Sequence, residues 1–401
     1  MSIPKDWELK KLSEIAEIRG GKRLPKGEVL QNENNGYPYI TVSDMYFGGI
    51  DTKKIKFVPI HVVEKVKRYR VKKDDLIIAV AGNTLGIISR IPDKLDNANL
   101  TENADMITNI KINKEYLFYV LSSDIIQRKI EDEKTTNAQP KLALERIRNF
   151  DIPIPINESE INKIAEILIT WDKTIELKEK LIEQKKEQKK GLMQKLLTGE
   201  VRLPGYDEEW IKIKIGKLIG EISEKSTVNN QYEVLSVTKN GIVSQNEHFK
   251  KQVASENNVG YKVIRKNNLV FSTMNLWMGS LDVLTDYEIG IVSPAYKVFE
   301  FKLENIIPSF AKFYMLSEHM IWLYNVNSEQ GASIVRRNLD LKALLNTIVK
   351  VPPIQEQQAI SKVLIAINNE IILLENELEL LKQQKQGLMQ LLLTGKVRVK
   401  V

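Results

Sequence analysis

The sequence predicts an α+β fold, in which two mixed α/β globular segments are joined by two long helices that form an antiparallel coiled coil, with an internal pseudo-two-fold duplication. Three observations predict it. A block of 13 residues returns almost unchanged near the C-terminus. Each copy ends a stretch whose apolar residues have the spacing of a coiled-coil helix. The residues before each helix alternate strand-like and helix-like runs, which is typical of mixed α/β domains.

The repeat is the strongest of these features. Residues 191–203 read GLMQKLLTGEVRL and residues 387–399 read GLMQLLLTGKVRV, so that 10 of 13 positions are identical at an offset of 196. The same offset continues upstream without a gap, and the two halves also begin alike, at Trp7 and Trp210. A period near 200 residues is too long for a solenoid repeat and indicates a duplicated domain.

The helices follow from the spacing of apolar residues. In the second copy the seam alternates steps of four and three, at Ile360, Leu364, Ile367, Ile371, Leu374, Leu378, Leu381, Lys385, Leu388 and Leu392. This period of 3.5 residues predicts a coiled coil. The first copy keeps the seam but has Lys178, Lys185 and Lys189 in it, whose methylene stems can be buried while the ammonium stays in water. Prolines upstream and the glycines Gly199 and Gly395 predict where the helices begin and end.

Two such helices in one chain are expected to pack on each other in antiparallel fashion, although each could instead pack on its own globular segment. A helix over 161–197 would be about 55 Å long. We therefore divide the chain into a globular segment at 1–155, a helix at 156–201, a second globular segment at 202–351 and a second helix at 352–401. Helical patterns inside the globular segments cover 114–130 and 308–324.

Composition excludes several classes of protein. The net charge of +7 suits a polyanionic partner, although 52 acidic residues make the excess modest. The chain has no cysteine, which removes disulfides, thiolate nucleophiles and most structural zinc sites and fits a reducing compartment. No signal peptide and no run of about 18 apolar residues is found, so we expect a cytoplasmic protein without a membrane span.

The search for catalytic motifs finds none. The sequence lacks the phosphate-binding pattern G-x-x-x-x-G-K-[ST], the dinucleotide pattern G-x-G-x-x-G and the amino-methyltransferase pattern N-P-P-[YF]. The three histidines, His61, His248 and His319, are scattered without metal-ligand spacing. We therefore expect no catalytic residues, no metal and no cofactor.

The chain resembles the specificity subunits of type I restriction-modification systems. The resemblance is carried by two globular segments that alternate with repeated helices ending in GLMQ-x-LLTG-x-VR, and by local matches at 80–89 (VAGNTLGIIS), 137–155 and 331–357. Two places depart from the family pattern. Residues 157–160 read NESE where E-Q is usual, and residues 274–279 read MNLWMG in place of a second G-x-T-x-G.

This resemblance implies a non-catalytic DNA reader. Each globular segment would be a target recognition domain that reads one half of a bipartite, asymmetric site on double-stranded DNA, and the helices would hold the two readers at a fixed spacing. The implied partners are two modification (adenine methyltransferase) subunits, which dock through the helices, and the restriction subunits that carry ATP-driven translocation and cleavage. No membrane is implied.

Matching to the family also selects candidate DNA contacts in loops. Amide and hydroxyl side chains can bond base edges, and arginine and lysine bond guanine or phosphate. The matching selects Asn83, Thr84, Gln139, Lys141, Arg336 and Arg337. Lys22 and Arg23 are added from the GGKR run, and Asn275 is added as a substitute for Asn83 by its position after a strand-like run. For each of them a solvated loop residue is the alternative. The lysines at 185, 186, 189 and 190 could lie over spacer phosphates, or could form an ordinary solvated helix face.

Two other functions remain open from the residues alone. A coiled-coil adaptor with two protein-binding domains would fit the same architecture, and it differs from a DNA reader in that its binding would not weaken steeply with salt. A self-sufficient restriction enzyme would need cleavage or methylation motifs that the sequence does not show.

Overall fold

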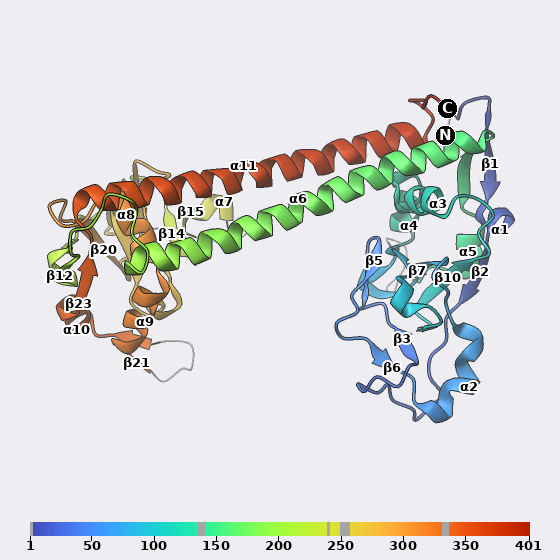
Figure 1. Cartoon of the computed structure of the whole chain (residues 1–401), viewed down its shortest axis with the longest axis horizontal. Coiled ribbons are helices and arrows are strands. Elements are labelled where there is room, and N and C mark those ends of the chain that lie inside the picture. The colour runs from blue at the N-terminus through green and yellow to red at the C-terminus, as the bar shows by residue number, and fades with distance from the viewer. Residues whose placement is uncertain (1–2, 135–140, 239–240, 249–256, 331–336) are drawn as a thin grey trace. The chain divides into compact units, whose positions relative to one another are not determined.

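The computed structural model describes residues 3–134, 141–238, 241–248, 257–330 and 337–401. The chain divides into two compact units. Unit 1 is Met1–Glu179 with Glu377–Val401, and unit 2 is Lys180–Asn376. The two long helices are α6 (Glu158–Thr198) and α11 (Ile354–Leu393). Each helix is divided between the two units, so each unit consists of a globular domain and part of the helix pair (Figure 1).

The two helices pair in antiparallel fashion inside each unit. In unit 1, Asp172 and Glu179 of α6 bond to Lys385 and Lys382 of α11 respectively. In unit 2, Lys186 of α6 bonds to Glu375 at 2.7 Å and Lys189 bonds to Asn368 at 2.7 Å. In both units the residue number on α11 falls as that on α6 rises, which confirms the predicted antiparallel coiled coil. The buried seam includes Ile164, Leu168, Ile182, Leu196, Ile360, Leu364, Ile371, Leu378 and Leu392.

The ends of the helices also belong to the globular cores. Ile164 and Leu168 of α6, with Leu392 and Leu393 of α11, lie in the core of unit 1. Leu196, Leu197, Ile360 and Leu364 lie in the core of unit 2. Helix pairing and helix-to-domain packing, which the sequence offered as alternatives, therefore occur together.

The duplication is visible in individual contacts. Arg398 bonds to both carboxylate oxygens of Glu160 in unit 1, at 2.6 and 2.7 Å. Arg202 bonds to both oxygens of Glu356 in unit 2, at 2.5 and 2.7 Å. The two pairs are related by the offset of 196: the glutamate is on α6 and the arginine follows α11 in unit 1, whereas the glutamate is on α11 and the arginine follows α6 in unit 2. Both carboxylates are almost fully buried.

The globular domain of unit 1 is built on a four-stranded antiparallel sheet. Its order is β2 (Glu17–Gly20), β10 (Ala104–Thr108), β7 (Leu76–Ala79), β8 (Ile88–Arg90). A separate pair, β1 (Trp7–Lys11) with β11 (Asp151–Pro155), closes the domain before α6. The remaining elements are α1 (Leu12–Ile15), β3 (Pro38–Ile40), β4 (Met45–Tyr46), β5 (Gly49–Ile50), β6 (Lys56–Phe57), α2 (Val63–Val66), β9 (Asn99–Leu100), α3 (Lys114–Ser122), α4 (Asp124–Lys134) and α5 (Leu144–Arg148).

Unit 2 repeats this plan with different details. Its four-stranded sheet has the order β13 (Ile219–Ile222), β20 (Tyr296–Phe301), β17 (Leu269–Ser272), β18 (Leu281–Val283), and its closing pair is β12 (Ile211–Lys214) with β23 (Ile348–Val351). The remaining elements are β14 (Leu235–Thr238), β15 (Gly241–Ser244), α7 (Gln245–His248), β16 (Lys262–Arg265), β19 (Ile289–Val292), α8 (Pro308–Tyr314), α9 (Glu318–Val326), β21 (Ser328–Gln330), β22 (Arg337–Leu339) and α10 (Leu341–Asn346).

Helices form at 114–130 and 308–324 as predicted, and each range holds two helices. The chain turns extended at Ser123, between α3 and α4, and at Ser317, between α8 and α9. At Ser317 the side chain accepts a hydrogen bond from the backbone of Met320 and so begins the second helix. A serine that caps a new helix looks, from spacing alone, like a residue inside a continuous one.

Among the residues that the structure describes, no helix is both long enough and apolar enough to cross a bilayer.

Candidate nucleic-acid interface

The main sheet of unit 1 places several of the predicted contact residues at one of its ends. Gly20 of β2 pairs with Asp105, and Ala79 of β7 pairs with Ala104, so both strands finish beside the start of β10. Because β2 and β7 each run antiparallel to β10, the segments that follow them emerge at the same end of the sheet. These segments carry Lys22 and Arg23 after β2, and Asn83 and Thr84 after β7.

Lys141 joins them from a distant part of the sequence. It forms an isolated antiparallel bridge with Ala81, and the backbone amide of Leu142 donates to the carbonyl of Val80 at 2.9 Å. We name the set Lys22, Arg23, Asn83, Thr84 and Lys141 the polar end of unit 1. All of these residues except the half-buried Thr84 are exposed, so four of them can meet a ligand without a rearrangement of the core.

The loop that carries Asn83 is held by two glycines in the left-handed region. Gly82 has a φ of 75° and Gly86 a φ of 91°, a conformation that side chains disfavour. A Cβ on Gly86 would lie 3.0 Å from Ile130 of α4, and the Gln127 side chain of α4 donates to the Gly86 carbonyl at 3.0 Å. The loop is thus fixed against α4 while its tip, at Asn83, stays in solvent.

Charge at the polar end of unit 1 is partly compensated. The Arg23 guanidinium bonds to Glu102 at 2.5 Å, although its own side chain is 78% exposed. Burial alone would raise the pKa of Glu102, but the hydrogen bonds that it accepts, from Arg23 first, hold that pKa below its usual value. Any phosphate or base that bonds to Arg23 would therefore have to replace this carboxylate.

A buried carboxyl group lies just behind this surface. Asp105 is 5% exposed, and burial raises its pKa to about 6 despite the opposing charges of Lys141 and Arg148. The Asp105 carboxyl group therefore changes its protonation state close to neutral pH. Asp105 lies in β10, the strand beside whose start β2 and β7 both end.

The same arrangement occurs in unit 2. Ile222 of β13 pairs with Val298, and Ser272 of β17 pairs with Tyr296, both in the first half of β20, so the segments after both strands share one end of the sheet. Asn275 follows β17, and the backbone amide of Arg337 donates to the carbonyl of Met274 at 3.3 Å. Asn275 and Arg337 are thereby brought together, as Asn83 and Lys141 are in unit 1.

Arg337 is held tightly by its own domain. Its guanidinium stacks on Trp277 at 4.7 Å from the ring centroid and donates to the Asn325 side chain, while Nε is buried without an acceptor among the described residues. Because Nε is buried, it cannot meet a ligand in this conformation, so a contact from the half-buried Arg337 would have to come from its terminal nitrogens. The candidates Gln139 and Arg336 lie outside the described residues.

One residue of this end was missed from the sequence. Lys225 follows β13 as Lys22 follows β2, at the offset of 203 that also relates Trp7 to Trp210. Lys225 is exposed, and its backbone bridges to Lys262, whose own ammonium is buried against the carbonyl of Tyr296 at 2.6 Å. We name Lys225, Asn275 and Arg337 the polar end of unit 2. The tryptophan offset was the signal that could have found Lys225.

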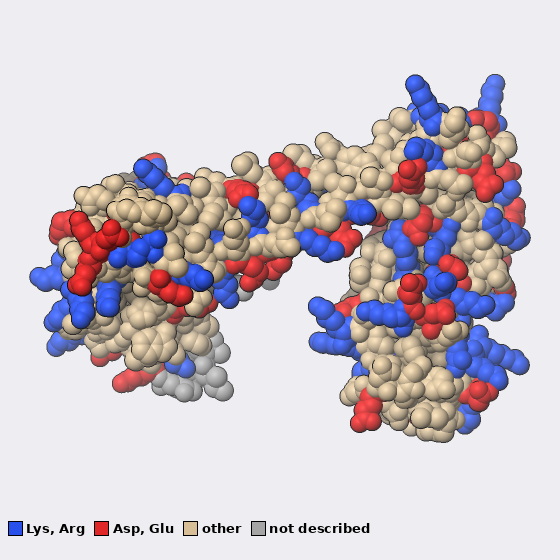
Figure 2. Space-filling model, viewed as in Figure 1, with Lys and Arg blue, Asp and Glu red and all other residues tan. Residues whose placement is uncertain are grey.

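The lysine run on α6 is paired within unit 2. Lys185 bonds to Glu370 at 2.6 Å, Lys186 to Glu375 and Lys189 to Asn368, and Lys190 lies 3.7 Å from Glu318. Burial also lowers the pKa of Lys189. On the face shown in Figure 2, Lys and Arg side chains lie among Asp and Glu rather than forming one continuous positive surface. The positive charge of the run therefore serves mainly to join the two helices.

No cluster of three or more metal-ligating side chains occurs within the described part of the chain.

Comparison with known proteins gives one family. Residues 4–186 match the type I restriction modification DNA specificity domain. The chain is 26% identical over 421 residues to the putative type I restriction enzyme MjaX specificity subunit of Methanocaldococcus jannaschii, covering 99% of this chain and 95% of that protein. It is 30% identical over 206 residues to the MjaVIII specificity subunit of the same organism, an alignment that spans 50% of this chain and 48% of that protein.

The fold is also found among solved structures. A chain from a study of complex assembly and conformational transition of the type I R-M system superimposes with a TM-score of 0.62 at 17% identity, over 99% of this chain and 100% of that chain. At this identity the likeness concerns the fold alone.

Proposed function

We propose that the chain is a specificity subunit of a type I restriction-modification system, and that it reads a bipartite, asymmetric site on double-stranded DNA through the polar ends of its two units. The observation that carries the proposal is the recurrence of the same sheet end in both units with different side chains. In this proposal residues 1–155 and 202–351 are the two target recognition domains, and residues 156–201 and 352–401 are the spacer helices.

The difference between the two polar ends supports an asymmetric site. Unit 1 offers Asn83, Thr84 and Lys141 from its loop and returning segment, whereas unit 2 offers Asn275 and Arg337 from the equivalent places. Asparagine pairs well with adenine, and arginine and lysine pair well with guanine. Two unlike sets of donors and acceptors would therefore select two unlike half-sites.

The helices would set the distance between the half-sites. Helix α6 has 41 residues, which corresponds to about 60 Å at 1.5 Å per residue. A turn of B-DNA is about 34–36 Å, so a rod of this length suits two readers in neighbouring turns of the major groove. The number of base pairs between the two half-sites would then affect binding, but their sequence would not.

Exposed apolar side chains outside the seam support docking of two modification subunits. Leu177 and its repeat mate Leu373 are 56% and 63% exposed, and Ile169 and Ile365 form a second such pair two turns earlier. Ile169 and Leu177 form one apolar stripe in unit 1, and Ile365 and Leu373 form the equivalent stripe in unit 2. Two copies of one partner would occupy them, and the methyl transfer, translocation and cleavage would be the work of the modification and restriction subunits in the cytoplasm.

Duplex selection tests the proposal. The chain, with and without the methyltransferase encoded beside it, is incubated with a random duplex library, and the bound fraction is sequenced. We expect two short, unlike motifs at one fixed spacing, and an affinity that falls steeply with salt. If the complex with the methyltransferase forms and no spaced motif emerges, the DNA-reading function is wrong and a protein-binding adaptor takes its place.

A further inference from the structure

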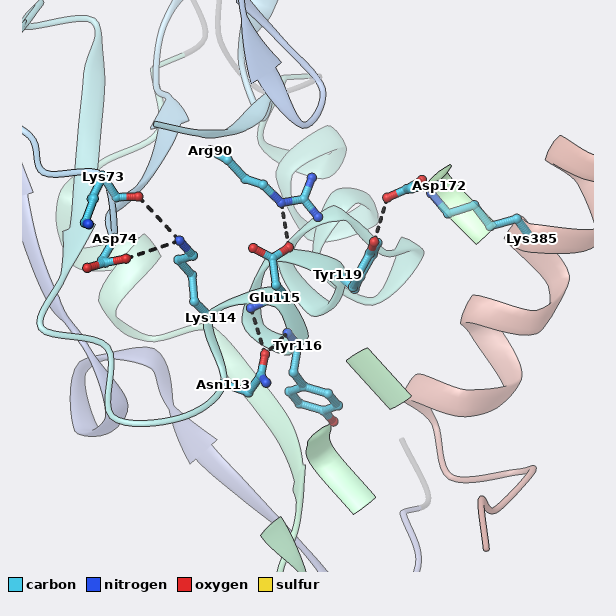
Figure 3. A network of polar contacts seen from close by, with 10 residues as sticks. All are labelled: Lys73, Asp74, Arg90, Asn113, Lys114, Glu115, Tyr116, Tyr119, Asp172 and Lys385. Atoms are coloured by element: carbon cyan, nitrogen blue, oxygen red, sulfur yellow. Dashed lines mark hydrogen bonds and ion pairs between the residues drawn. The ribbon is translucent and has the colours of Figure 1, made fainter. Parts of the chain in front are cut away.

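We infer that Tyr119, Asp172 and Lys385 form a clamp that fixes the angle of the first globular domain on the helix pair, and that this clamp determines how strictly one spacer length is accepted. The contact geometry stands by itself, and the effect on the spacer rests on the proposed function. Figure 3 shows the Tyr119 hydroxyl directed at Asp172, with Lys385 reaching the same carboxylate from α11.

The clamp joins three elements of unit 1 at one carboxylate. The Tyr119 hydroxyl of α3 donates to Oδ2 of Asp172 on α6 at 2.6 Å. The Lys385 ammonium of α11 bonds to Oδ1 of the same group and lies 5.4 Å from the centre of the Tyr119 ring. Tyr119 is 1% exposed, and burial raises the pKa of its hydroxyl well above its usual range. The hydroxyl therefore remains a donor at any working pH.

The position of Asp172 along α6 gives the clamp its leverage. A nearer attachment of the domain to the same helix is the hydrogen bond from Asn113 to Asn162, at 2.8 Å. Asp172 is ten residues further on, or about 15 Å along the axis. Between these two bonds, Ile164 and Leu168 of α6 pack in the core of the same domain. The bond at Asp172 lies one turn beyond Leu168, so it extends the attachment along the helix and limits how far the domain can tilt.

A chain of contacts leads from the clamp to β8, the edge strand of the sheet whose opposite end carries the polar end of unit 1. Arg90 lies at the end of β8, the strand that follows the Asn83 loop. Its guanidinium stacks on Phe118 at 3.5 Å, lies 5.4 Å from the Tyr119 ring, and bonds to Glu115 of α3 at 2.6 Å. The strand that carries the loop is thus held to the helix that carries Tyr119.

Unit 2 has the helix-to-helix part of the clamp without the link to its domain. The repeat mates of Lys385 and Asp172 are Lys189 and Asn368, which bond at 2.7 Å. Tyr314 occupies the place of Tyr119 in the matching FYxLS pattern, but its hydroxyl donates to the carbonyl of Lys350, in the closing strand of its own domain, at 2.8 Å. Among the described residues, this tyrosine hydroxyl ties the first domain to α6 but not the second, whose nearby link to α6 is the Lys190–Glu318 pair at 3.7 Å.

A spacer that is one base pair longer or shorter moves a half-site by about 3.4 Å and turns it by roughly 35°. A domain whose attachment extends to Asp172 cannot follow this change without breaking contacts. A domain that has lost this bond can tilt further and recover part of them.

The pair Y119F and Y314F tests the inference, because each variant removes one buried hydroxyl donor from equivalent tyrosines. Binding of the complex is measured to duplexes that carry the two selected motifs at the selected spacing and at one base pair more or less. We expect Y119F to lower the preference for the selected spacing by about fivefold, the order expected from one hydrogen bond. Y314F should keep the wild-type preference. Single-base changes within each half-site should lower the DNA affinity of Y119F by the same factor as that of the wild type. This result would distinguish a positioning role of Tyr119 from a general loss of structure.

Equal spacing preference in Y119F, Y314F and the wild type would overturn the clamp. Should Y119F not fold, D172A and its repeat mate N368A make the same comparison, and an unchanged preference in D172A again overturns it. Failure of the proposed function has a different signature, because the wild type itself would then show no spaced motif.

Discussion

Arg398 and Glu160, 238 positions apart in the sequence, meet through two hydrogen bonds of 2.6 and 2.7 Å, and Arg398 also bonds to Asp6. Three separate parts of the chain are thereby joined: its beginning, the first turn of α6 and the segment after α11. The Glu160 carboxylate is buried, so Arg398 is its main compensation.

Replacing this arginine should destabilise unit 1. In R398M the Glu160 carboxylate stays buried without its cation, which costs more than the pair itself contributes. We expect the midpoint of thermal unfolding to fall by a few degrees, and the double variant E160Q/R398M to recover part of the loss. If the double variant is no more stable than R398M, the unpaired Glu160 carboxylate is not the cause of the destabilisation. Calorimetry makes the measurement, with R202M as the equivalent change in unit 2.

Asp105 should make stability depend on pH near neutrality. Burial raises its pKa to about 6 in the folded chain, above the value near 3.8 expected when the chain is unfolded. The folded state therefore binds the proton more tightly, so the ionised carboxylate costs stability above pH 6, and the cost disappears as the pH falls towards 4. D105N should raise the unfolding midpoint at pH 8 by a few degrees and change it much less at pH 4. An equal shift at both pH values would contradict this.

Asn83 and Asn275 should act on separate half-sites. N83A is expected to weaken selection at one position of the first motif by about 1–3 kcal/mol, the size of a bidentate contact to adenine, and to leave the second motif unchanged. N275A should do the reverse. Sequencing of the duplexes that each variant selects provides the measurement, and a change in both motifs by either variant would disprove the assignment.

Lys225 should contribute to affinity without contributing to sequence preference. In K225A the slope of log affinity against log salt should fall by about one, as expected when one phosphate contact is lost. The selected motifs should stay the same. Titrations at several salt concentrations test this, and exposed Lys266, which is paired with Glu288 away from the polar end, provides a control as K266A.

The apolar stripes should set the stoichiometry of the complex. L177K places a charge in one stripe and L373K in the other, so each variant is expected to bind one methyltransferase subunit where the wild type binds two. Native mass spectrometry of the assembled complexes counts them. L9K, at an exposed leucine outside the helices, should bind two. Two bound subunits in both L177K and L373K would place docking elsewhere.

The helices could be predicted from sequence because their seam is periodic and duplicated, but their register could not. Lys178 and Lys185 interrupt the apolar seam of α6, and they bond to Glu377 and Glu370 of the other helix. A period of 3.5 residues is satisfied by several alignments of two helices. Which glutamate faces which lysine is decided only when the globular domains fix where each helix begins.

The polar ends were predictable only in part. The loop of Asn83 and the segment of Lys141 were selected from the family pattern, and their meeting depends on the pairing of Ala81 with Lys141 across 60 positions of sequence. Lys225 could have been found from the offset of 203 that relates Trp7 to Trp210, but this offset differs from the 196 of the helix repeat and rests on few matching residues. Side chains that differ between two copies of one fold leave no internal pattern from which to read them.

The first half of the chain contains one glutamate and one arginine of the two repeated ion pairs, although these two residues do not pair with each other in the whole chain. Residues 1–203 contain both Glu160 and Arg202, which are the repeat mates of Glu356 and Arg398. Two copies of this half could therefore close on each other through two identical Arg202–Glu160 bonds, each the counterpart of a bond that the whole chain makes once. Such a homodimer would carry the same reader twice, and the DNA that suits it would be a palindrome.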